Sequence, residues 1–191
     1  MTQRSTRIRR HPERSAPDAL NSILQAGLVA HVGYILDNEP YVIPFSYFNE
    51  PNDTNILYLH GSSASQTLRA LRNGATVCVS IAIADGIVYS KTAINHSMNY
   101  RSAVGYGKAE VMQDLAEIAE MFDRWIGKYT PGRQPSIDYR RVDDEMMRGT
   151  VVLKAHIASW SVKARSGGSR EEDDENPAVP GTSGVIDISQ F

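Results

Sequence analysis

The chain has 191 residues, which is enough for one well-packed core and favours a single domain over two. Apolar residues make up 41% and charged residues 22%, as in an ordinary soluble protein, and the net charge of −2 gives no overall case for nucleic-acid binding. No apolar run approaches the roughly 18 residues of a membrane span. The basic start, Met1 to His11, has no apolar segment behind it, so we expect a cytoplasmic protein with a flexible N-terminus over 1–11.

Cys78 is the only cysteine, which excludes an intrachain disulfide and any multi-cysteine zinc site. It sits in an apolar run, where the role of a small buried hydrophobe is favoured over that of a nucleophile. The histidines show no spacing typical of a metal site, so we expect none, although a single histidine can ligate heme.

The first part of the chain predicts a short helix followed by three strands. The helix has one apolar face and ends before Gly27, and Asp37-Asn38 supplies turn chemistry between the first two strands. Pro44 lacks an N–H, so its strand belongs at an edge or bulge, where backbone groups stay free for a ligand. The predicted elements are a helix over Pro17–Ala26 and strands over Leu28–Leu36, Tyr41–Phe48 and Asn55–His60.

The second part predicts two helices and further strands. Ser63 and Gln66 have the spacing of a capping box for a helix that ends at Gly74, and Asp114 with Glu117 caps the next helix. Asp85-Gly86 predicts a tight hairpin. The other expected elements are a returning strand over Ile87–Ser90, a helix to Ile126, a helical turn over Asp143–Met147, and strands over Ala75–Ala84, Tyr100–Met112 and Thr150–Ser161.

From Ser166 the composition changes to glycine, acidic residues and proline, which indicates an extended arm over 166–191 with an apolar end that docks on something. The remainder, 1–165, holds six or seven antiparallel-looking strands without βαβ alternation. The expected fold is therefore mainly β (α+β), a small β-barrel with peripheral helices.

Two polar segments are candidates for an anion site. The stretch Ser90–Gly107 carries two Asn, a His, four Ser/Thr hydroxyls, an Arg and a Lys, although a solvated surface loop would explain these residues equally well. The other segment, His60-Gly-Ser-Ser63, leads from a strand into a helix N-terminus, where unpaired N–H groups favour phosphate. A plain helix cap is the alternative there.

The order of several motifs resembles the pyridoxamine 5'-phosphate oxidase-related flavoproteins, most of all the branch that includes the nitroimidazole-resistance (Nim) proteins. The resemblance runs from about Arg9 to the C-terminal arm. It is carried by Val42-Ile-Pro-Phe-Ser-Tyr47, Leu57-Tyr-Leu-His-Gly-Ser62, Asp85-Gly86, Asn95-His-Ser-Met-Asn-Tyr-Arg-Ser102 and Lys163-Ala-Arg-Ser-Gly167. It implies a split β-barrel over 1–165 that forms a homodimer with FMN at each of two subunit interfaces.

The resemblance also implies which residues hold FMN. The phosphate would lie near Ser62, Ser65 and Gln66, beside Gly61, and near Asn99, Tyr100, Arg101 and Ser102. The flavin ring would lie along Ile43, Pro44, Phe45 and Ser46 with His60 close by, and Lys163 and Arg165 would reach the cofactor of either subunit. Many relatives carry Arg or Lys where Gln66 stands, and a lost charge of this kind weakens phosphate binding by roughly 1.5 to 3 kcal/mol.

The resemblance is compatible with two kinds of function, one enzymatic and one not. The first is an FMN-dependent oxidoreductase that reduces a small organic substrate, with nitroaromatics as candidates, using NAD(P)H. The second is a non-catalytic flavin- or heme-binding carrier or sensor, and FAD or a deazaflavin could replace FMN. Because the flavin would perform the electron chemistry, the sequence points to no acid, base or nucleophile.

Overall fold

The computed structural model describes residues 6, 8–72, 74–169 and 171–188. Residues 1–5 and 7, part of the N-terminus expected to be flexible, lie outside this description. The strands are β1 (Val29–Leu36), β2 (Glu39–Phe48), β3 (Ile56–Ser62), β4 (Thr76–Tyr89), β5 (Ser97–Val111), β6 (Thr150–Arg165) and β7 (Gly184–Asp187). The helices are α1 (Leu20–Ala26), α2 (Gln66–Arg72), α3 (Leu115–Tyr129), α4 (Asp144–Met147) and α5 (Glu172–Glu175), with short 3₁₀ turns at Pro12–Arg14, Pro17–Ala19 and Ala93–Asn95.

The seven strands form one antiparallel sheet in the order β1-β2-β3-β6-β5-β4-β7, and a further β1–β4 pairing closes the first six into a ring. Two seams of the ring are short: β1 and β4 share three residue pairs, from His31 to Gly33, and β2 and β3 meet only through Tyr47 opposite Leu59 and Phe48 opposite Tyr58. The remainder of that edge of β2, over 39–46, pairs with no strand in the described part of the chain. The predicted split β-barrel with peripheral helices is therefore confirmed.

Strand alternation explains the core. Along each strand every second side chain enters the barrel, where Val32, Val79, Ala103 and Leu153 are completely buried. Helix α1 adds Ile23 and Leu24 to this core, and both side chains are also inaccessible to solvent. Burial of each such aliphatic side chain contributes about 1.5 to 3 kcal/mol.

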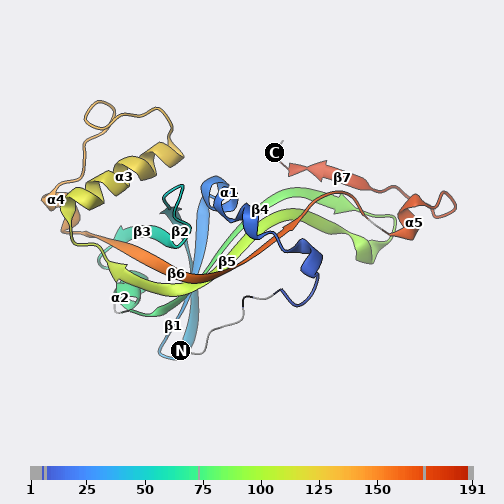
Figure 1. Cartoon of the computed structure of the whole chain (residues 1–191), viewed down its shortest axis with the longest axis horizontal. Coiled ribbons are helices and arrows are strands. Elements are labelled where there is room, and N and C mark those ends of the chain that lie inside the picture. The colour runs from blue at the N-terminus through green and yellow to red at the C-terminus, as the bar shows by residue number, and fades with distance from the viewer. Residues whose placement is uncertain (1–5, 7, 73, 170, 189–191) are drawn as a thin grey trace.

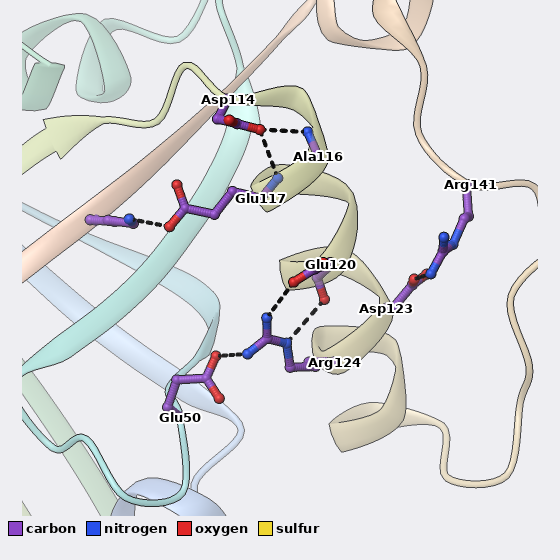
Figure 2. Close-up of polar contacts among 9 residues, drawn as sticks. Glu50, Asp114, Ala116, Glu117, Glu120, Asp123, Arg124 and Arg141 are labelled. Carbon is purple, nitrogen blue, oxygen red and sulfur yellow. Dashed lines mark hydrogen bonds and ion pairs between the residues drawn. The ribbon is translucent and has the colours of Figure 1, made fainter.

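Helix α3 covers a different side of the barrel, over β2, β3 and β6, and forms a second apolar cluster with Phe48, Tyr58 and Val152. As predicted, Asp114 caps it: one carboxylate oxygen accepts the N–H groups of Ala116 at 2.8 Å and Glu117 at 3.0 Å (Figure 2). Figure 2 also shows Arg124 held between Glu120 of the same helix and Glu50, which follows β2. These contacts fix α3 relative to the barrel wall.

The predicted hairpin at Asp85-Gly86 is wrong. Strand β4 runs straight through this dipeptide to Tyr89, with Asp85 as the extra residue of a β-bulge between Ala84 and Gly86. Strand β5 begins at Ser97, inside the expected polar loop, and β6 continues beyond Ser161 to Arg165. In Figure 1, β4 and β5 consequently extend well past the barrel toward α5 and β7.

The C-terminal segment returns along this extension, because β7 pairs with the outer end of β4 over Gly86–Tyr89. Among the described residues, none of the helices is both long and apolar enough to cross a membrane.

Candidate functional site

The strands present a second, uncovered surface on the side away from the core. Its residues are the cross-strand partners of one another, and none of them is buried. We call this surface the open face. It consists of Val29, His31, Gly33 and Ile35 of β1; Pro40, Val42, Pro44 and Ser46 of β2; Cys78, Ser80, Ala82, Ala84 and Ile87 of β4; Met98, Tyr100, Ser102, Val104 and Tyr106 of β5; and Ser159, Ser161, Lys163 and Arg165 of β6.

The composition of the open face is unusual for a solvent-exposed sheet. It contains no carboxylate, its only charged side chains are Lys163 and Arg165, and most other positions are apolar or carry a hydroxyl. Val42 is 64% exposed and Ile35 68% exposed. An uncovered apolar surface of this breadth marks a binding or association surface rather than a solvated exterior.

Six of the residues that the sequence predicts for the cofactor lie on the open face: Pro44, Ser46, Tyr100, Ser102, Lys163 and Arg165. The structure places Ile43, Phe45 and Arg101 on the opposite side. Ile43 stands opposite Val32 in the register and packs with Phe45 against the barrel core. The predicted group is thus divided between two faces by strand alternation.

Three positively charged side chains lie in this region, and they differ in how many hydrogen bonds they already make within the chain. Arg101 Nη2 contacts Asp85 Oδ1 at 2.7 Å and its Nε lies 3.0 Å from Oδ2, and these hydrogen bonds raise the pKa of the guanidinium. Arg165 donates to Asn99 and to the carbonyl oxygens of Gly167 and Gly168. In the described part of the chain, the ammonium of Lys163 has no hydrogen bond or ion pair. It is therefore the cation most available to an anion.

Asn99 is buried in β5 opposite Gly86, where its side-chain oxygen accepts a hydrogen bond from Arg165. The other predicted residues lie at the junction of β3 and α2. Ser62 Oγ accepts the N–H of Ala64 at 3.2 Å, and Ser65 Oγ lies 3.4 Å from the N–H of Leu68. The helix begins at Gln66 with Ser65 as its cap, so the predicted capping box starting at Ser63 is wrong by two residues. Gly61 allows close packing, because a Cβ there would meet Leu68 at 3.0 Å.

His60 does not lie near the open face. Its ring packs edge-on against Phe122 and Trp125 of α3, with centroid distances of 4.9 and 5.3 Å. Burial there lowers the pKa of the His60 imidazole, because desolvation disfavours the charged ring.

One chain does not bring the two predicted phosphate segments together. In the sheet register Ser62 pairs with Thr150 at one end of β6, whereas Tyr100 pairs with Arg165 at the other end. The 16 residues of β6 measure about 50 Å along the strand. A cradle built from both segments would need a second copy of the chain.

Sequence reasoning missed several residues of this region. His31, Val42 and Tyr106 join the open face only through the register of four strands, which no local motif reports. Asp85, read as a turn residue, is the partner of Arg101. The only available signal was the position of the acidic residue in a long β-branched run, where a bulge is an alternative to a turn.

The fold and the open face define a split-barrel protein whose strands present an exposed, largely apolar sheet surface. A comparison with family models identifies the family: residues 16–164 match the model described as pyridoxamine 5'-phosphate oxidase, and the chain belongs to this family. The resemblance found in the sequence is thereby confirmed. A comparison with curated protein sequences finds no match.

Solved structures are similar over most of the chain. The flavocytochrome Anf3 of Azotobacter vinelandii is 30% identical, with a TM-score of 0.82 over 96% of this chain and 83% of its own. The FAD and heme binding protein of Mycobacterium smegmatis is 28% identical, with a TM-score of 0.79 over 91% and 82%. A proposed 5-nitroimidazole antibiotic resistance protein of Bacteroides thetaiotaomicron VPI-5482 is 26% identical, with a TM-score of 0.62 over 78% and 83%.

Proposed function

We propose that this chain is a flavin-binding oxidoreductase that acts as a homodimer, with the flavin held between the open faces of two subunits. The observation that carries the proposal is the open face itself, a sheet surface without carboxylates on which Lys163 is the cation that makes no hydrogen bond or ion pair within the described part of the chain. The similarity to flavin-binding proteins over nearly the whole chain supports the same reading.

The residues fit a flavin nucleotide. The small and apolar side chains around Pro44 offer a flat surface for the planar flavin ring. The unpaired edge of β2 over 39–46 offers backbone N–H and C=O groups to the polar atoms of that ring. Lys163 would neutralise phosphate, with the hydroxyl of Ser102, its cross-strand neighbour, as a further hydrogen-bond partner. Because Ser62, Ser65 and Gln66 lie at the far end of β6, they would serve this site from the partner subunit.

When bound, the flavin would accept hydride from a nicotinamide donor and pass electrons to an organic acceptor, for which nitroaromatics are candidates. The residues of the chain would orient the ring, exclude water through the apolar open face, and hold the phosphate. FMN is the flavin that the family resemblance implies. FAD is the direct competitor, because the similar M. smegmatis protein binds FAD.

The test is a titration of purified protein with FMN and with FAD, followed by fluorescence quenching. Lys163→Ala should weaken binding of the preferred flavin by about tenfold or more, since a hydrogen bond to a charged group contributes about 1.5 to 3 kcal/mol. Lys154→Ala is the matched control, because Lys154 lies on the same strand but pairs with Glu117 beneath α3. A wild-type protein that binds neither flavin, or equal losses in both variants, would contradict the proposal.

The oxidoreductase assignment is tested separately from binding. The flavin-loaded protein is mixed anaerobically with NADH or NADPH, and bleaching of the flavin absorbance is followed before a nitroaromatic acceptor is added. Reduction by a donor and reoxidation by the acceptor are expected. Flavin that binds tightly but is reduced by neither donor would favour a carrier or sensor.

A second candidate adds heme to the flavin, because the similar M. smegmatis protein binds FAD and heme and the similar Anf3 is a flavocytochrome. Two histidines are candidate ligands. His31 is exposed on the open face opposite Pro44, and His60 lies under α3, where burial favours the neutral imidazole that can ligate heme. Titration with hemin tests this, and loss of the Soret band in His31→Ala but not in His60→Ala, or the reverse, would identify the ligand.

A further inference from the structure

Strand β7 adds the C-terminal arm to the same sheet as the open face. Its residues pair with β4 so that Ile186 stands opposite Ile87, and Ile87 stands opposite Met98 of β5. Directly paired residues share a face of the sheet, so these three side chains form one row. Met98 and Ile87 belong to the open face, and Ile186 therefore continues it onto a third strand.

The row is apolar and exposed. Met98, Ile87 and Ile186 are each 44% accessible to solvent in the single chain. The acidic neighbour Asp187 alternates to the other face, opposite Gly86, so the strand adds an apolar side chain to the open face and no carboxylate. Within β7, Ile186 is therefore the apolar side chain that the acidic arm adds to this surface.

The arm is held in this position by contacts that do not involve the row. Asp174 accepts the backbone N–H of Lys91 at 2.7 Å and the Ser90 hydroxyl at 3.0 Å, and the Lys91 ammonium donates to the carbonyl of Asn176 at 2.9 Å. The pKa of Asp174 is lowered by hydrogen bonds from Ser169, Lys91 and Ser90, so the carboxylate remains charged. Ile186 is consequently presented on a fixed strand.

We infer that β7 is part of the dimer interface and that its occupant is the open face of a second copy of this chain. The inference rests on the proposed homodimer and extends it to the arm. Three features argue for a second copy: the row is continuous with the open face, the joint surface carries no carboxylate, and a two-fold axis would pair one apolar open face with another. The row consists of apolar side chains, so it offers a charged or flexible partner no charged group to pair with.

The experiment uses sedimentation velocity on the full chain across a concentration series, with and without flavin. Ile186→Asp should raise the dimer dissociation constant by at least about tenfold, because a two-fold interface contains the substitution twice. The matched control is Val185→Asp: Val185 is also 44% exposed and lies next to Ile186, but it faces the opposite side of β7. This variant should dimerise within about twofold of wild type. Circular dichroism confirms that both variants are folded.

The outcomes separate the two proposals. A wild-type dimer that Ile186→Asp leaves intact, or that both variants weaken equally, overturns the role of β7 while the proposed homodimer stands. A wild-type chain that remains monomeric at every concentration, with flavin bound, overturns both. A selective loss in Ile186→Asp supports β7 as an interface strand.

Discussion

Replacing Gly107 by alanine should lower the free energy of unfolding by about 3 kcal/mol or more. A Cβ at this position would lie 1.9 Å from the carbonyl oxygen of His156 and 3.0 Å from the Cα of Ile157. Both neighbours are backbone atoms of the adjacent strand, so β5 and β6 would have to separate by about 1 Å at the bulge. Overpacking of a core costs about 1 to 3 kcal/mol where side chains can adjust, and here they cannot.

The assay is urea unfolding followed by circular dichroism, with the slope of the transition compared between variants. Gly127→Ala in α3 is the control, since a Cβ there meets nothing within 4 Å. Alanine is favoured over glycine in a helix by about 0.5 to 1 kcal/mol, so the control should be slightly stabilised. Equal stability of Gly107→Ala and wild type would show that the approach of the two strands is looser than the structure indicates.

Three further predictions concern polar contacts. Burial lowers the pKa of Lys128 to about 8 from 10.5, so the folded state binds fewer protons than the unfolded state between these values. The free energy of unfolding of wild type minus that of Lys128→Met, measured in denaturant titrations, should therefore increase with pH over this range. A decrease would contradict burial as the cause of the lowered pKa. Tyr129→Phe should cost about 1 to 3 kcal/mol in the same assay, because its hydroxyl bridges the backbone of Tyr47 and Leu28; an unchanged midpoint would refute this. Asp174→Asn should accelerate amide hydrogen exchange in β7 while β6 stays protected, and equal exchange in both strands would argue against Asp174 as the anchor.

Local sequence patterns were sufficient to predict much of the fold. The alternation of apolar residues located β1 to β3, and Asp114 identified the start of α3, because periodicity and capping are short-range properties. The predicted break at Asp85-Gly86 was wrong because strands are usually five or six residues long, whereas β4 has 14. The dipeptide is compatible with both a turn and a bulge, and only the pairing with β5 distinguishes them.

The candidate site was predicted less completely, for a different physical reason. A motif names residues that are adjacent in sequence, whereas a sheet face selects every second residue from several strands. The family motif thus groups Tyr100, Arg101 and Ser102, although the structure places Arg101 on the opposite side from the other two, paired with Asp85. The register that makes this division is set by long-range pairing, which no stretch of the sequence contains by itself.

The bulges decide which side chains can reach a ligand on the open face. In β6, Ile157 pairs with Gly107 and Ser159 with Tyr106, so Ala158 is an extra residue that shifts the alternation by one. Odd-numbered residues before it, such as Leu153, enter the core, whereas Lys163 after it faces outward. Without that extra residue Lys163 would be directed into the core, where an unpaired ammonium costs several kcal/mol. One inserted residue therefore provides the open face with its available cation.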